Sequence, residues 1–130
     1  MGTQVLIVDD ADWSAVTLEI ALFTLPDVIV VRAASGQEAW SVVEKQPISA
    51  IITDLHMPGM DGFELVERVR AKPTGAAIPI IVVSADDAPE NRDRAKLLGA
   101  SAFFVKPYSP AAVRETLKEL LHDTPSHTSL

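Results

Sequence analysis

The chain of 130 residues contains no cysteine, few aromatic residues and no long apolar run. The absence of cysteine excludes disulfide bonds and thiolate-based metal or nucleophile sites. Apolar runs such as IPIIVVSA are too short to span a bilayer, and the beginning, MGTQVLIVDD, lacks the basic region of a secretory signal. We therefore expect a cytoplasmic protein that is neither secreted nor inserted in a membrane.

Basic residues are also scarce, with 11 Lys and Arg against 18 Asp and Glu and a formal charge of −7. A surface of this sign repels nucleic-acid phosphates and anionic membranes, so we expect direct contact with neither. A protein partner or a cation fits the charge better. The length suits one compact domain, which we predict over residues 1–122, followed by a flexible polar tail or the start of a linker at residues 123–130.

What the chain does contain is an alternation of two apolar patterns. Stretches rich in Val and Ile predict strands buried on both faces of a sheet, at residues 5–8, 28–31, 48–53, 78–84 and 102–105. The intervening segments have apolar residues at i, i+3 and i+4, which predicts helices. Ser35 with Glu38, Ser109 before Pro110, and Gly99 are local signals for helix starts and a helix end. The prediction is an α/β fold, (βα)5, with a doubly wound parallel sheet of five strands.

Polar residues follow the predicted strands at their carboxyl ends, where ligands bind in folds of this kind. Asp9 and Asp10 follow the first strand, Asp54 the third, Ser84 the fourth and Lys106 the fifth. Three crowded carboxylates repel one another, which favours a bound cation, and hard oxygen donors suit Mg²⁺. Because Mg²⁺ often binds phosphate oxygens as well, the set predicts a phosphoryl site in which Lys106 and Ser84 hold the remaining oxygens.

Asp54 is the best candidate for the nucleophile, since Asp9 and Asp10 are adjacent and better placed to hold the metal. A carboxylate is already ionised at neutral pH and forms an acyl phosphate without a general base. Plainer interpretations stay open: the two N-terminal aspartates could end a strand and cap a helix, and Ser84 could simply end a strand. The imidazole of His56 could tune the access of water, or the residue could contribute only its carbonyl.

Four segments, in this order and spacing, resemble the receiver domain of response regulators in two-component signalling: LIVDD, ITDLHMPGMDG, IIVVSA and FFVKP. The resemblance covers nearly the whole chain and implies the flavodoxin-like strand order 2-1-3-4-5. It implies a phosphoacceptor at Asp54, which takes its phosphoryl group from a phosphohistidine of a sensor histidine kinase or a histidine phosphotransfer protein. Such a domain is a signalling phosphoacceptor that catalyses its own phosphorylation and dephosphorylation, and not an ordinary enzyme.

The same resemblance implies a role for each residue at the strand ends. Asp10, Asp54 and the backbone carbonyl of His56 would bind Mg²⁺ directly, and Asp9 would act through a water molecule. Lys106 would contact a phosphoryl oxygen.

Ser84 and Phe103 would form a switch according to the resemblance. Movement of Ser84 toward the phosphoryl group would leave room for Phe103 to turn inward. The surface of the fourth helix, fifth strand and fifth helix would then change and bind a downstream output protein or domain, with dimerisation left open. Phe103 has no hydroxyl, so only a packing change remains for the switch. The peptide bond between Lys106 and Pro107 would be cis.

Three other functions compete with this interpretation. A haloacid-dehalogenase-like phosphohydrolase would need an acid/base aspartate two residues after the nucleophile, where this chain has His56. A flavin-binding module would need a phosphate loop rich in Ser, Thr or Gly after the first strand, whereas VDDADWS would repel a phosphate. The serious rival is a receiver-like scaffold that binds a partner without being phosphorylated. The presence of both Asp54 and Lys106 favours the phosphoacceptor.

Overall fold

The computed structural model describes residues 2–10 and 12–122, and only the backbone of residues 12–14. The predicted tail at residues 123–130 lies outside the described residues. Strands and helices alternate along the chain, with one 3₁₀ turn: β1 (Thr3–Val8), α1 (Asp12–Leu22), β2 (Val28–Ala33), α2 (Gly36–Lys45), β3 (Ala50–Asp54), α3 (Gly62–Ala71), η1 (Pro73–Gly75), β4 (Ile80–Ser84), α4 (Pro89–Leu98), β5 (Ala102–Val105) and α5 (Pro110–His122).

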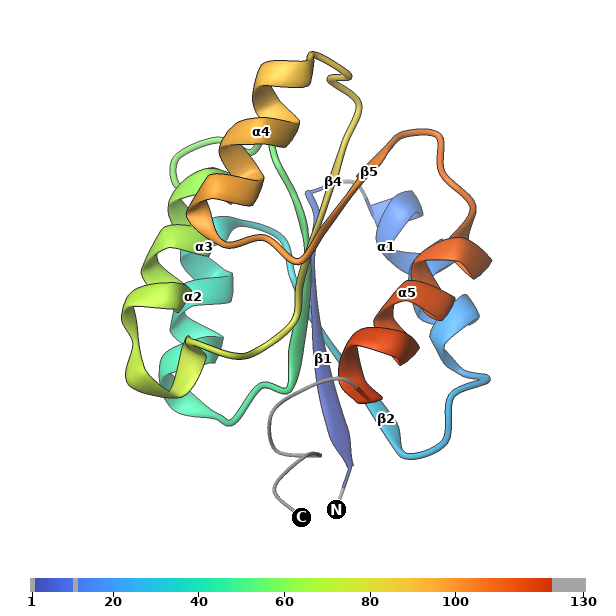
Figure 1. The fold of residues 1–130 in the computed structure, drawn as a ribbon. Helices are drawn as coiled ribbons and strands as arrows, with labels where there is room; N and C mark the ends of the chain where they lie inside the picture. Colours follow the sequence, from blue (N-terminus) through green and yellow to red (C-terminus); the bar gives the residue numbers. More distant parts are fainter. Residues whose placement is uncertain (1, 11, 123–130) are drawn as a thin grey trace.

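The five strands form one parallel sheet in the order β2-β1-β3-β4-β5. Helices α2, α3 and α4 cover one face of this sheet, and α1 and α5 cover the other (Figure 1). The predicted α/β fold and its strand order are confirmed. None of the helices in the described part of the chain is long and apolar enough to cross a membrane.

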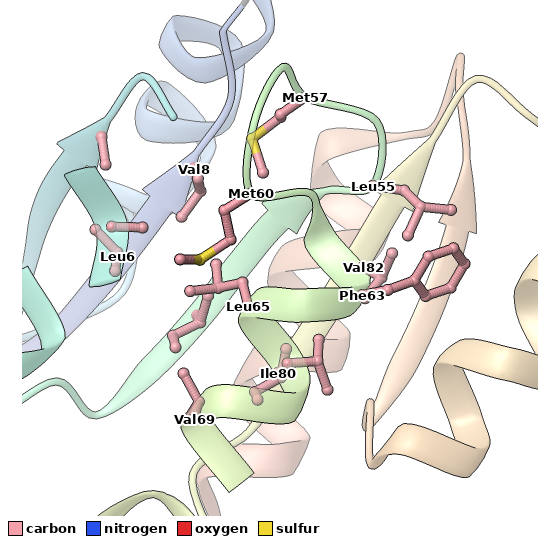
Figure 2. Packing of buried hydrophobic residues seen from close by; sticks show 14 of the residues in the cluster. Leu6, Val8, Leu55, Met57, Met60, Phe63, Leu65, Val69, Ile80 and Val82 are labelled. Atoms are coloured by element: carbon pink, nitrogen blue, oxygen red, sulfur yellow. The ribbon is translucent and has the colours of Figure 1, made fainter. Parts of the chain in front are cut away.

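The core consists of two apolar layers, one on each face of the sheet. Successive residues of a strand point to opposite faces, so Leu6 and Ile51 enter the layer under α2, α3 and α4, while Ile7 and Ile52 enter the layer under α1 and α5. The loop after β3 adds to the first layer, where Met60 points in beside Leu65 (Figure 2). Both layers therefore hold β3, which ends in Asp54, rigidly in the middle of the sheet.

The edge strands depart from the expectation of burial on both faces. Every residue of β3 and β4 is buried, but β5 is only partly buried and Ile29 of β2 is 50% exposed. An edge strand has a neighbour on one side only, and the covering helices leave part of its outer side open to water. Several boundaries also differ from the prediction: β1 starts earlier, at Thr3, β2 continues to Ala33, and β3 runs over Ala50–Asp54. The fourth strand, β4, starts after Pro79, which has no N–H for the ladder.

The helix termini follow the local signals in the sequence. The Ser35 hydroxyl accepts a hydrogen bond from the backbone N–H of Glu38 at 3.1 Å, and the Ser109 hydroxyl accepts one from the N–H three residues further on. Gly99 ends α4 with φ of 112°, a conformation that favours glycine. Asp61 caps α3 in the same way as Ser35 caps α2. The caps at Ser35, Asp61 and Ser109 fix where α2, α3 and α5 begin relative to the strands before them.

Gly62, the first residue of α3, lies against the end of β3. A Cβ atom here would lie 2.5 Å from the carbonyl oxygen of Asp54 and 2.9 Å from Cα of Leu55. Helix propensity alone would favour alanine by up to about 1 kcal/mol. Because the close atoms belong to the backbone, we expect Gly62→Ala to lower the free energy of unfolding by about 1–3 kcal/mol, measured by urea denaturation. A variant as stable as the wild type would show that α3 can move away from β3.

Candidate functional site

The strand register brings the predicted acidic residues together. Val8 of β1 pairs with Thr53 of β3, so the next residues, Asp9 and Asp54, lie side by side at the carboxyl edge of the sheet. Carboxylate oxygens of Asp9, Asp10 and Asp54 all lie within 4.8 Å of one another. The Asp9 and Asp54 side chains are 2% and 12% exposed, whereas Asp10 is exposed. The cluster therefore opens to solvent on the side of Asp10.

Lys106 connects this cluster to the other half of the sheet. Its backbone N–H donates to the carbonyl of Ser84 at 2.8 Å, which continues the pairing of β4 and β5 past the end of β5. Its Nζ donates to Oδ2 of Asp54 at 2.9 Å and to Oδ2 of Asp9 at 3.2 Å. The peptide bond between Lys106 and Pro107 is cis. One ammonium thus faces three carboxylates, which leaves an excess of two negative charges at the site.

Two opposing effects act on the pKa of Lys106. Burial disfavours the charged ammonium and works to lower the pKa, but hydrogen bonds and charge attraction to Asp54, with the smaller contribution of Asp9, outweigh burial and raise it above its ordinary value. The ammonium therefore stays charged throughout the physiological pH range. A fixed positive charge next to the Asp54 carboxylate suits the binding of an anionic group there.

Ser84 is buried, and its hydroxyl belongs to a network that joins two loops. The hydroxyl oxygen accepts a hydrogen bond from the backbone N–H of Asp86 at 3.0 Å, and the carboxylate of Asp86 accepts one from the N–H of Ala88 at 3.1 Å. Nε2 of His56 lies 3.3 Å from Oδ2 of Asp86. Hydrogen bonds from Ala88 and Asn91, and then the contact with His56, lower the pKa of Asp86. The loop after β3 is thereby linked to the loop after β4.

Sequence reasoning missed Asp86, although a signal was present. Aspartate two residues before a backbone N–H that needs an acceptor is common in turns, and in the segment SADDAP Asp86 stands two residues before the N–H of Ala88. The same reasoning placed His56 at the site, and the structure shows its imidazole 57% exposed and in contact with Asp86 of the loop after β4. Its side chain therefore faces another loop, and is not directed into the core.

Phe103 lies on β5 beside Val82 of β4, and both side chains belong to the layer under α2, α3 and α4. Alternation along β4 puts Ser84, two residues after Val82, on the same face of the sheet. The Phe103 ring is only partly buried, and the guanidinium of Arg92 in α4 lies 5.2 Å from the ring centroid. The two residues expected to form the switch are therefore on neighbouring strands and on one face.

Tyr108 is a second residue near the site that sequence reasoning missed. It follows Lys106 by two residues, is partly buried, and packs edge-on against Phe104 with ring centroids 6.4 Å apart. Burial raises the pKa of Tyr108 to about 12, while the Lys106 ammonium works to lower it and the Asp9 and Asp54 carboxylates work to raise it. The pKa of Tyr108 therefore depends on the charges of Lys106, Asp9 and Asp54.

The donor set at this edge fits a hard divalent cation. The oxygens of Asp9, Asp10 and Asp54 are close enough to share one ion, and carboxylate oxygen is the donor that Mg²⁺ prefers. The net negative charge of the site also favours a cation over a water molecule. Fold and site together define a doubly wound domain with an acidic cluster and a lysine at its carboxyl edge.

Comparison with known protein sequences identifies the family. The model of the response regulator receiver domain matches residues 5–118. A chemotaxis protein CheY homolog of Campylobacter jejuni is 33% identical over 119 residues, which are 91% of this chain and 92% of that protein. The chemotaxis protein CheY1 of Helicobacter pylori is 31% identical, over 91% of this chain and 96% of that protein. The chain belongs to the response-regulator receiver family, whose members are the phosphoacceptors of two-component systems.

Solved structures agree with this assignment. The chemotaxis response regulator CheY4 of Vibrio cholerae superposes with a TM-score of 0.83 at 32% identity, and the match covers 92% of this chain and 99% of that one. The receiver domain of a Pseudomonas aeruginosa sensor histidine kinase, solved with a magnesium ion coordinated in the active site cleft, has a TM-score of 0.84 at 26% identity. That match covers 95% of this chain and all of the other. Receiver domains act with histidine kinases and output partners.

Tyr108 is the only tyrosine in the chain, so tyrosinate absorbance in a pH titration reports on it alone. We expect a pKa of about 12 in place of the ordinary 10.0. Because folding raises this pKa, the stability that comes from protonated Tyr108 is complete below pH 10.0 and is lost as the pH rises through about 12. Lys106→Met should raise the pKa further, since the ammonium favours tyrosinate. Titration at the ordinary pKa, with the fold intact by circular dichroism, would contradict this.

Proposed function

We propose that this receiver domain accepts a phosphoryl group on Asp54 in a Mg²⁺-dependent reaction with a phosphohistidine. The donor is a sensor histidine kinase or a histidine phosphotransfer protein, and we place the reaction in the cytoplasm. One observation supports this more than any other: the Asp54 carboxylate is held 2.9 Å from the Lys106 ammonium, beside the carboxylates of Asp9 and Asp10. A nucleophile, a fixed cation and a set of metal donors thus meet at one point.

In the proposed reaction an oxygen of the ionised Asp54 carboxylate attacks the phosphorus atom. The phosphorus–nitrogen bond of the phosphohistidine breaks, its electron pair stays on the imidazole nitrogen, and an acyl phosphate forms on Asp54. Lys106 stabilises the negative charge on the phosphoryl oxygens, and the Ser84 hydroxyl donates a hydrogen bond to one of them. For this the hydroxyl leaves its present position beside the N–H of Asp86.

Mg²⁺ would be held directly by Asp10, Asp54 and the backbone carbonyl of His56, and through a water molecule by Asp9. The acidic cluster and the magnesium-bound receiver of Pseudomonas aeruginosa support this assignment. When bound, the ion supplies positive charge that offsets the repulsion between the carboxylates and the incoming phosphoryl group.

Loss of the phosphoryl group uses the same residues. Water attacks the phosphorus atom, the bond between phosphorus and the Asp54 oxygen breaks with its electron pair on that oxygen, and the carboxylate is restored while inorganic phosphate leaves with the oxygen and protons of the water. Lys106 again stabilises the charge that develops on the phosphoryl oxygens. The chain therefore acts as the catalyst of its own phosphorylation and dephosphorylation, and not on a separate substrate.

The output of phosphorylation is a change in the surface formed by α4, β5 and α5. Movement of Ser84 toward the phosphoryl group opens space on the face that it shares with Phe103, and the ring turns inward. This surface includes Leu97, which is 87% exposed. We place there the contacts with a downstream output protein or domain, or with a second copy of the chain.

Incubation with acetyl phosphate or phosphoramidate and Mg²⁺ should add one phosphoryl group to the protein, measured by intact mass. Asp54→Asn should show no adduct because it removes the nucleophile, and the wild type without Mg²⁺ should show none either.

Absence of an adduct with several donors, although the protein is folded, would favour the unphosphorylated scaffold. A saturable, Mg²⁺-dependent change in tryptophan fluorescence with beryllofluoride would instead identify a working site whose phosphoaspartate is short-lived. The two measurements together therefore decide between a scaffold and a phosphoacceptor.

Mg²⁺ should stabilise the protein by mass action, by about 2.7 kcal/mol at a hundred times its dissociation constant. Asp10→Asn should remove most of this gain while raising the stability of the metal-free protein, because it relieves repulsion among the carboxylates. Asp87→Asn, at an exposed acid in the loop before α4, is the matched control and should keep the full gain. Urea denaturation with and without Mg²⁺ measures both effects. An equal gain in Asp10→Asn would place the ion elsewhere.

A further inference from the structure

Helix α4 is held to the domain in a different way from its neighbour α3. In α4, which lies wholly within the described part of the chain, Ala95 alone is buried, whereas α3 buries five residues including Leu65 and Val69. The α4 N-terminus begins after Ala88, whose methyl side chain cannot cap a helix. At the other end Arg70 donates to the carbonyl of Gly99 at 2.9 Å. The C-terminal end is therefore anchored through Arg70, and at the end nearer the site the Asn91 side chain hydrogen-bonds to the carboxylate of Asp86 in the preceding loop.

Two arginines provide the side contacts of this helix. The guanidinium of Arg92 lies 5.2 Å from the centroid of Phe103, and that of Arg94 lies 4.1 Å from the centroid of Phe63. Residues two apart point to nearly opposite sides of a helix, so Arg92 reaches β5 while Arg94 reaches α3. A guanidinium near the face of an aromatic ring is attracted by the electron density of the ring. Each arginine thus attaches one flank of α4 to a neighbouring element.

We propose that Arg92 opposes the switch, because its contact with Phe103 stabilises the partly exposed position of that ring relative to the inward position. We call this effect the brake. An inward turn of Phe103 has to break this contact. The proposal rests on the proposed function, since it takes Phe103 to be the residue that turns. Arg92 acts through Phe103 and touches neither the acidic cluster nor Lys106, so it is a positioning residue.

The strength of the contact suits a brake. An exposed cation–π contact changes a two-state equilibrium by about two- to five-fold, which is enough to set the resting population without preventing the change on phosphorylation. A ligand that binds better when the ring has turned inward loses affinity by the same two- to five-fold factor, because the position of the ring and the binding of the ligand are thermodynamically linked. Loss of Arg92 should therefore tighten the binding of a phosphoryl mimic.

Simple electrostatics predicts the opposite sign. Arg92 is positively charged, so its removal should weaken the binding of an anion if the charge acted only at long range. A brake on Phe103 predicts tighter binding. The direction of the change in affinity therefore separates the two explanations.

The test uses the full chain labelled with 4-fluorophenylalanine, with fluorine NMR to follow Phe103 and titration with beryllofluoride in the presence of Mg²⁺. Phe103→Leu assigns the signal. We expect Arg92→Gln to shift the Phe103 signal of the metal-free protein toward its beryllofluoride-bound position and to raise the affinity for beryllofluoride by about two- to five-fold.

Arg94→Gln is the matched control, since it removes the same charge and the same kind of ring contact from the same helix. It should leave the Phe103 signal and the affinity unchanged. Arg92→Lys keeps the charge and part of the attraction to the ring, and should lie between the wild type and Arg92→Gln.

An unchanged signal and affinity in Arg92→Gln, or a weaker affinity, would overturn the brake. Equal effects of Arg92→Gln and Arg94→Gln would also overturn it, because Arg94 contacts Phe63 and not the switch residue Phe103. If the wild type binds no beryllofluoride, the proposed function fails. The brake then fails with it, because there is no switched state that Arg92 could oppose, whereas an unchanged Arg92→Gln beside a wild type that binds beryllofluoride overturns the brake alone.

Discussion

The constraint on which the rest of the structure depends is the mutual repulsion of three carboxylates at one edge of the sheet. Holding Asp9, Asp10 and Asp54 this close while all three are ionised is unfavourable unless positive charge is brought to them. Lys106 supplies part of that charge from the opposite end of the chain, with its Nζ between Asp54 and Asp9. The remaining negative charge is what makes the site suitable for a divalent cation and, with that cation, for a phosphoryl group.

The central strands that carry the carboxylates are packed on both faces, whereas the loop after β4 is held by hydrogen bonds near the surface. Strands β1, β3 and β4 are packed between two apolar layers, which fixes the backbone that carries Asp9 and Asp54. The hydroxyl of Ser84 is held instead by a single backbone N–H in a loop, and that loop contacts His56 through Asp86. Ser84 itself is fully buried at the end of β4, so only the loop side of this network, at Asp86 and His56, is open to water.

Helix α4 extends the same division to the surface. Its polar sequence leaves Ala95 as its one buried residue within the described chain, and arginine–ring contacts take the place of an apolar face. Such contacts are exposed and weak, so they are easily exchanged for others. In the proposed switch, these exposed contacts let the Phe103 ring, at the edge of the layer under α2, α3 and α4, change position while the fully buried residues of that layer stay packed.

Local patterns in the sequence determined the five strands and the helices between them, because the spacing of apolar residues depends on near neighbours in the chain. They also determined the cap at Ser35 and the left-handed end at Gly99, because the hydrogen bonds at a helix end join residues only a few positions apart. The order of residues also placed Asp54 and Lys106 at strand ends. Tertiary structure alone decided that the Lys106 ammonium lies between two particular carboxylates, that the edge strands are partly open, and that Arg92 covers Phe103. These contacts join residues far apart in the chain or on different elements, and they depend on how helices and strands pack, which no local pattern encodes.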